Sequence, residues 1–319
     1  MTTFDANHIP MHDFISPKRI LVATDLTDGE YLIPHAVAQA KTCGAMVTLI
    51  HAILPLEAMP LDAGAVAYAD WEKTERETLE SLSEMAAQIE AYGVSCDVTA
   101  KHGQAADVVQ EEIRTTHATR LIMASHGRGR WGQFVMGSVA NQLLGNVSIP
   151  IFVVGPKSAG FPEHAKPRRI LHPVSLNGDY RLGVELAAGL AREFRAELTL
   201  LHVPDRDVEA SIHPGCTLSW AENLFARLFP NDDLELETSV KINVAFGKLP
   251  EEIRKAAIST SADWIVMGVQ DGLPLWPILE STAYKVLAGA NCPVLAFRRE
   301  PLHFECAMAS QEHSLVGIA

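Results

Sequence analysis

The sequence predicts an α/β fold in which an open, twisted parallel sheet of five strands occurs twice. Short apolar, β-branched runs alternate with longer stretches of helical period, which is the pattern of parallel strands joined by crossover helices. The runs ILVAT, MVTLI and RLIMA are almost continuously apolar, as expected for strands that helices cover on both faces. The length of 319 residues suits two domains of roughly 150 residues each.

The first half contains strand patterns separated by helix patterns. We expect strands near residues 19–25, 45–53, 94–101, 119–125 and 149–154. We expect helices near residues 29–43, 66–92, 104–116 and 137–146. In a sheet of this kind, ligands bind beyond the carboxyl ends of the strands, where the strand order reverses. The loop that follows the fourth strand therefore lies on the edge of the sheet where ligands bind.

Segments of the first half recur in the same order in the second half. RILVATDLTDGE (19–30) resembles RILHPVSLNGDY (169–180), and AMVTLIHAI (45–53) resembles AELTLLHVP (196–204). The further pairs are 102–113 with 246–257, 119–125 with 262–268, and 149–155 with 292–298. The members of each pair lie about 143 to 151 positions apart, so the chain reads as a tandem duplication.

The duplication divides the chain into two domains with a linker and a tail. We predict domains at 17–156 and 168–299. Residues 157–167 are rich in proline, glycine and small side chains, which is typical of a linker. Residues 300–319 show no clear element, and we expect them to extend over the surface.

The composition argues against several classes of protein. The 26 Lys and Arg residues against 39 Asp and Glu residues give a net charge of −13, which disfavours binding to nucleic acid and to anionic membranes. No apolar run approaches the roughly 20 residues that span a bilayer, and the N-terminus lacks the pattern of a signal peptide. The cysteines number 5 and include no CxxC, so we expect no disulfide framework. We therefore predict a cytoplasmic protein that binds neither nucleic acid nor membranes.

A glycine-rich loop within MASHGRGRWGQFVMGSVANQLL (123–144) joins the fourth strand to the last helix of the first half. The glycines permit a close backbone approach that a Cβ would forbid. They are Gly127, Gly129, Gly132 and Gly137. Ser138 opens the helix, whose free N–H groups and dipole favour an anion, and Arg128 and Arg130 add positive charge. These features predict a phosphate-binding loop; the alternative is a plain glycine-rich connection with an ordinary Ser cap.

The same loop resembles the nucleotide signature of the universal stress proteins. That signature is Gly, two residues, Gly, nine residues, and then Gly followed by Ser or Thr. Gly127 and Gly137-Ser138 fit its second part, and Ala124 stands where the first Gly would be, which leaves the backbone accessible. The order of elements and Asp25 after the first strand extend the resemblance over nearly the whole chain. The resemblance implies a tandem member with a Rossmann-like αβα fold in each half.

The family resemblance implies an adenine-nucleotide site in the first half. Adenine would lie near Ala52 and Met123, and the carboxylate of Asp25, with Thr24 beside it, would approach the nucleoside. Main-chain N–H groups would face the phosphates, and His126 and Arg128 are the expected neighbours. These groups belong to Gly127, Gly137, Ser138 and Val139. The implied ligand is ATP, ADP or AMP, with Mg²⁺ or Mn²⁺ as the cation that bridges phosphates.

The second half departs from the signature. Aligned on Ser281-Thr282, it keeps Gly268 but has Asp271 where the first half has Gly127. A carboxylate close to a triphosphate costs roughly 1–4 kcal/mol of repulsion. Pro274 and Pro277 remove N–H donors, and Ser175 follows the first strand in place of Asp25. We predict that this half binds no ATP and serves as a structural partner or binds an uncharged or cationic ligand.

Several histidines and cysteines have two interpretations each. Two His-x-x-Cys pairs in the second half have the spacing of metal ligands, but unrelated surface histidines and buried thiols are the simpler interpretation. These pairs are His213 with Cys216 and His303 with Cys306. His51 and His202 follow the second strand of each half at matching positions, where a structural role is favoured over that of a catalytic base.

No catalytic motif accompanies the predicted nucleotide site. The sequence contains no GxSxG, no HExxH and no paired carboxylates at a telling spacing, so we expect at most slow ATP hydrolysis. We favour a stress-response regulator in which an adenine nucleotide biases conformation or the binding of protein partners. The alternatives are a nucleotide-independent interaction scaffold and a slow ATP phosphohydrolase.

The last strand of each half predicts an assembly. IPIFVVG (149–155) and CPVLAFR (292–298) lie at matching positions. The family resemblance implies antiparallel pairing of these edge strands between domains. In a tandem chain the halves can pair internally as a pseudo-dimer, which hides edges that would otherwise template association. Two chains can then associate further as a homodimer.

Overall fold

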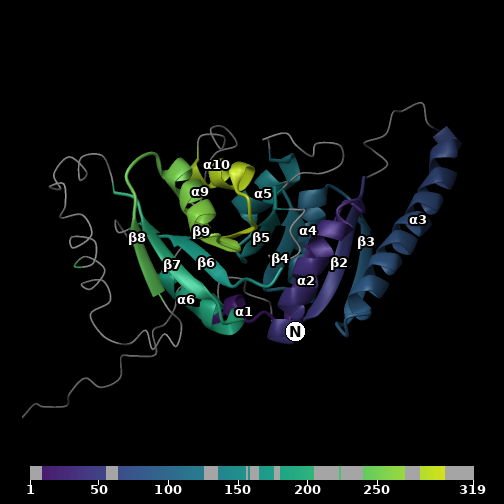
Figure 1. Cartoon of the computed structure of the whole chain (residues 1–319). Coiled ribbons are helices and arrows are strands. Elements are labelled where there is room, and N and C mark those ends of the chain that lie inside the picture. The colour runs from purple at the N-terminus through teal and green to yellow at the C-terminus, as the bar shows by residue number, and fades with distance from the viewer. Residues whose placement is uncertain are drawn as a thin grey trace, which may run out of the picture.

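Strands and helices alternate through both halves of the chain, which confirms the predicted α/β fold (Figure 1). The computed structural model describes residues 9–54, 64–125, 136–155, 157–158, 165–175, 180–204, 223, 240–269 and 281–298. Among the described helices, none has both the length and the apolar character to cross a bilayer.

The first half follows the predicted order of elements. Its strands are β1 (Arg19–Ala23), β2 (Met46–Ile53), β3 (Cys96–His102), β4 (Arg120–Ala124) and β5 (Ile151–Val154). Its helices are α1 (Met11–Ile15), α2 (Gly29–Cys43), α3 (Gly64–Glu90), α4 (Ala105–Thr116) and α5 (Ser138–Asn146). Apart from α1, which the sequence did not predict, every boundary lies within two residues of the expected one.

The second half repeats this order in the residues that the structure describes. Its strands are β6 (Arg169–Pro173), β7 (Glu197–His202), β8 (Val240–Val244), β9 (Trp264–Val269) and β10 (Val294–Arg298). Its helices are α6 (Arg181–Phe194), α9 (Leu249–Ser259) and α10 (Thr282–Gly289). The predicted tail 300–319 and most of the predicted linker 157–167 lie outside the described residues.

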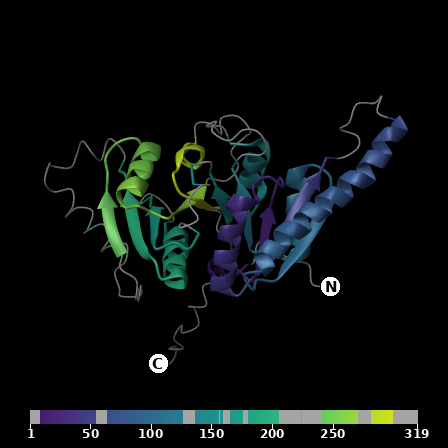
Figure 2. The same ribbon diagram turned by 45° about the vertical axis from the view of Figure 1, so that its right-hand side comes forward.

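The strands of both halves form one sheet of ten strands, in the order β3-β2-β1-β4-β5-β10-β9-β6-β7-β8. Within each half the strands are parallel. The halves meet where β10 pairs antiparallel with β5, with Leu295 opposite Phe152. The edge strands therefore pair inside the chain, as predicted for an internal pseudo-dimer, and Figure 2 shows the two groups of strands on either side of this junction.

Aromatic side chains join the cores of the two halves. Trp264 of β9 is fully buried, and its ring lies edge-on to Phe152 of β5 and to Phe194 of α6, with ring centroids 4.8 Å apart in both pairs. Each edge-to-face pair stabilises the fold by about 0.5–1.5 kcal/mol in addition to the gain from burying the two rings. Buried apolar residues of both halves accordingly form one continuous core.

The helix α1 ties the start of the chain to the second half, where it packs against α6. Ile15 contacts Gly189 so closely that a Cβ on that glycine would lie 2.2 Å from the isoleucine. Arg120, fully buried beneath α1, donates hydrogen bonds to the Phe14 carbonyl and, at 2.8 Å, to Gln39. Burial lowers the pKa of Arg120 to about 10, which still leaves it a cation at neutral pH.

Candidate functional site

A cavity of about 640 Å³ lies at the carboxyl ends of the first-half strands. This is the position at which β1 separates β2 from β4 and the strand order reverses, as expected for ligand sites of such sheets. Eight predicted site residues line it: Thr24, Asp25, Ala52, Met123, Ala124, Gly137, Ser138 and Val139. His126, Gly127 and Arg128, also predicted to bind the ligand, lie outside the described residues.

One wall of the cavity is the turn between β1 and α2. The Thr24 N–H donates to the Ile50 carbonyl at 3.1 Å, and the Thr24 hydroxyl donates to Asp28. Oδ1 of Asp25 accepts from both the N–H and the hydroxyl of Thr27, at 2.8 and 2.7 Å. These bonds hold the Asp25 carboxylate in a fixed orientation in the lining of the cavity.

Asp28 occupies the N-cap position of α2, where its side chain makes no capping hydrogen bond, and it is only 2% exposed. Burial raises the pKa of Asp28 from 3.8 to about 6; the hydrogen bond from Thr24 opposes this shift, and the charge of Asp25 adds to it. Two carboxylates therefore line the cavity: that of Asp25, which is half-buried, and that of Asp28, which is buried and has a pKa of about 6.

His51 fixes the distance between β2 and the turn that follows β1. Its Nδ1 donates to the Thr24 carbonyl at 2.8 Å, and in the second half His202 donates in the same way to Val174 at 3.1 Å. The two histidines lie within β2 and β7, whereas the sequence analysis placed them after these strands. Since each uses a ring nitrogen for an equivalent main-chain contact, the duplicated bond supports the structural interpretation.

The opposite wall is the start of α5, where Gly137 is the N-cap and no side chain caps the helix. The Gly137 N–H donates to the Ser125 carbonyl at 2.9 Å. Ser138 is the first helical residue, so it is not the ordinary Ser cap of the alternative interpretation. The N–H groups of the first turn have no acceptor within a helix, and residues Ser138 to Ala140 border the cavity. This wall therefore offers main-chain donors and a helix dipole to an anion.

The remaining walls are apolar or carry hydroxyls. Ile50 and Ala52 come from β2, and Met123 comes from β4. The helix α3 adds Thr74 and Thr78, which the sequence analysis missed. Hydroxyl side chains four residues apart on one helix face were the available signal. The cavity therefore suits a ligand that has a flat apolar part, which the residues of β2 and β4 would contact, and an anionic part, which the start of α5 would bind.

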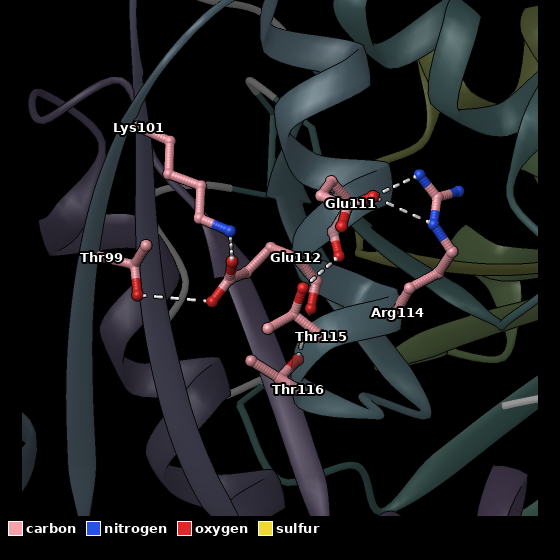
Figure 3. A network of polar contacts seen from close by, with 7 residues as sticks. All are labelled: Thr99, Lys101, Glu111, Glu112, Arg114, Thr115 and Thr116. Atoms are coloured by element: carbon pink, nitrogen blue, oxygen red, sulfur yellow. Dashed lines mark hydrogen bonds and ion pairs between the residues drawn. The ribbon is translucent and has the colours of Figure 1, made fainter. Parts of the chain in front are cut away.

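The helix α4 closes one side of the cavity and is held to β3 by an ion pair in which the carboxylate is buried and the ammonium is half-exposed (Figure 3). Glu112, with a side chain 5% exposed, lies 2.6 Å from the Lys101 ammonium of β3 and accepts from the Thr99 hydroxyl at 3.3 Å. In the second half Ala256 stands at the position that matches Glu112, and it is buried. The ion pair is thus a feature of the first half alone.

The corresponding region of the second half differs at both walls. The helix α10 begins with Ser281 as N-cap, and the Ser281 hydroxyl accepts the Tyr284 N–H at 3.2 Å. Where β6 ends, His172, Val174 and Ser175 help to line a space of only about 10 Å³. Asp271, Pro274 and Pro277 lie outside the described residues.

Metal-ligating side chains do not gather in groups of three or more anywhere in the described ranges. The pairs predicted as weak metal candidates, His213 with Cys216 and His303 with Cys306, fall in segments that the structure does not describe. Among the cysteines of the described part, Cys43, Cys96 and Cys292 are free thiols.

Comparison with known proteins finds the universal stress protein family twice, over residues 17–155 and again over 166–298. No curated protein matches the chain. A solved universal stress protein from Archaeoglobus fulgidus DSM 4304 has a TM-score of 0.66 and 18% identity, covering 88% of this chain and 98% of its own. A functionally unknown protein from Pseudomonas aeruginosa PAO1 gives 0.61 and 14%, covering 91% and 96%. At these identities the likeness to solved structures concerns the fold.

Proposed function

The chain belongs to the universal stress protein family, and on that premise we propose that it is a stress-response regulator whose first half binds an adenine nucleotide. The observation that carries the proposal is the uncapped start of α5, which turns main-chain donors toward a cavity of about 640 Å³. This volume falls within the roughly 300–1,000 Å³ typical of small-molecule sites.

The walls of the cavity suit the two ends of a nucleotide. In our proposal the phosphates lie at the start of α5, where Ser138 and Val139 offer their N–H groups and Ser138 its hydroxyl. The base lies against Ala52 and Met123, and the Asp25 carboxylate accepts hydrogen bonds from the nucleoside. His126, Gly127 and Arg128 remain predicted neighbours of the phosphates.

A divalent cation would be held mainly by the phosphates. The described residues include no group of three ligating side chains, and Mg²⁺ commonly uses phosphate oxygens with one or two carboxylates. Asp25 is the carboxylate that the cavity offers for this purpose. Bound Mg²⁺ or Mn²⁺ would neutralise phosphate charge in an acidic protein.

We propose regulation over catalysis because the sequence contains no GxSxG or HExxH motif and no paired carboxylates at a telling spacing. The nucleotide would favour one conformation or one set of protein partners in the cytoplasm. Catalysis would be limited to slow ATP hydrolysis. The second half, whose helix start is capped by its own serine, would bind no ATP.

The test is to identify what the protein carries and what it binds. Mass spectrometry of small molecules released from freshly purified, denatured protein should find an adenine nucleotide. Calorimetric titration of emptied protein with ATP, ADP and AMP should then give about one site per chain. Flat titrations with every nucleotide would support the scaffold instead, and turnover above about 1 s⁻¹ would support an enzyme.

A further inference from the structure

We propose that Tyr284, in the second half, is a positioning residue for the phosphate-binding turn of the first half. Its hydroxyl accepts a hydrogen bond from the main-chain N–H of Met136, with 3.2 Å between oxygen and nitrogen. Met136 immediately precedes Gly137, the N-cap of α5. The inference rests on the proposed function and deepens it, because it gives the second half a part in the same site.

The Tyr284 hydroxyl is presented from a well-fixed support. The residue is 6% exposed and lies in the first turn of α10. The Ser281 hydroxyl accepts the Tyr284 N–H, so the helix start that carries the ring is capped. Figure 1 shows α10 beside α5, above the junction of the two halves. A short side chain on α10 would not bridge these helices.

The contact determines which main-chain donors remain for a ligand. The Met136 N–H is bound to Tyr284, and the next N–H, that of Gly137, is bound to the Ser125 carbonyl. Two successive amides are therefore held by protein oxygens, and the donors that follow, from Ser138 onward, border the cavity. Donors fixed before the ligand arrives bind charge without the cost of reorganisation.

The first half has no tyrosine at the position that matches Tyr284, so this position makes no equivalent hydrogen bond to the second half. Aligned on Gly137-Ser138 and Ser281-Thr282, the position that matches Tyr284 in the first half is Ala140. Ala140 lines the cavity and is 2% exposed, and its methyl group offers no hydrogen bond. The half without the glycine signature therefore contributes a hydroxyl to the half that has it, and receives none in return from this position.

The test removes only the hydroxyl, with Tyr284→Phe in the full-length chain. Titration calorimetry with ATP and AMP should show Kd raised roughly 2- to 10-fold, the effect of losing one hydrogen bond in the supporting turn. Adenosine, which lacks phosphate, should bind with unchanged Kd. Tyr92→Phe is the matched control, because Tyr92 is 60% exposed and is not among the residues that line the cavity.

Hydrogen exchange gives a readout that does not depend on the ligand. The Met136 amide should exchange faster in Tyr284→Phe than in the wild type or in Tyr92→Phe. An unchanged Kd for ATP, or equal weakening of ATP and adenosine, would overturn the positioning role while leaving the proposed function intact. Wild-type protein that binds no adenine nucleotide would overturn the proposed function, and the positioning role with it.

Discussion

The last helices of the two halves, α5 and α10, begin at matching positions. They differ in whether the N-cap side chain accepts a main-chain N–H of the first turn. The helix α5 starts at Gly137 with no side-chain cap and faces a cavity of about 640 Å³. The helix α10 starts at Ser281, whose hydroxyl takes up the Tyr284 N–H. The N-cap side chain of α10 thus takes up one first-turn N–H, whereas the N-cap of α5 takes up none and leaves the first-turn donors to an anion.

The largest expected effect comes from giving α5 a charged cap. In Gly137→Asp the carboxylate would compete for the first-turn donors and repel phosphate, so Kd for ATP should rise at least about 100-fold. The main chain of Gly137, at φ −64° and ψ 154°, accepts any residue, and Asp is a favourable N-cap. The melting temperature should therefore stay the same or rise.

The matched control places the same residue in the other half. Ser281→Asp keeps a capping oxygen on α10, so neither stability nor ATP affinity should change much. Titration calorimetry with ATP on both variants gives the two Kd values, whose difference shows whether the two helix starts differ in function. Equal loss of ATP binding in both would mean that the two helix starts do not differ in function.

The second expected effect concerns the acidic turn of the first half. Because the folded-state pKa of Asp28 is raised from 3.8 to about 6, the folded protein binds more protons than the unfolded chain across this range. The stability that protonation supplies is present below about pH 4 and is lost as the pH rises through 6. Asp28→Asn, which does not titrate, should become more stable than wild type by up to about 3 kcal/mol at pH 7.

Urea unfolding of both proteins at a series of pH values measures this difference. Asn keeps an oxygen for the Thr24 hydroxyl and remains a good N-cap, so the folded turn is preserved. The two proteins should differ little near pH 4. A stability difference that stays constant between pH 4 and pH 7 would contradict the raised pKa of Asp28.

The smallest expected effect concerns the ion pair that anchors α4 in the first half alone. Lys101→Met leaves the buried Glu112 carboxylate with the hydrogen bond from the Thr99 hydroxyl (Figure 3) but without its cation. This change should cost about 1–2 kcal/mol of unfolding free energy. Adding Glu112→Ala, the residue of the second half, removes the unpaired charge. Denaturant unfolding of the double variant should show less than the sum of the single losses, and strict additivity would exclude a coupled pair.

Much of this comparison could be read from the sequence. The apolar runs of β1, β2 and β4 and the duplicated segments predict the strands closely, because buried parallel strands leave an unambiguous pattern. The pairing of the last strands is implied by the family resemblance, and the structure confirms it. Gly137-Ser138 predicts the start of α5 within one residue.

Other features have no local pattern to predict them. The bond between Tyr284 and Met136 joins positions 148 apart and depends on how two helices meet. The helix α1 is only five residues long and is held by tertiary contacts with α6. Thr74 and Thr78 give only their spacing as a signal, because hydroxyls four residues apart on a helix do not tell whether water or a cavity lies opposite.

The antiparallel pairing of β5 with β10 inside one chain has a consequence for how the protein can change by mutation. In an assembly of identical subunits, each inherited substitution is copied onto both sides of the axis, so gaining Tyr284 would also replace Ala140. Once both halves are encoded in tandem, either can acquire a residue that its twin could not tolerate. The proposed division of labour, in which one half holds the ligand and the other supports it, is open to a tandem chain for this reason.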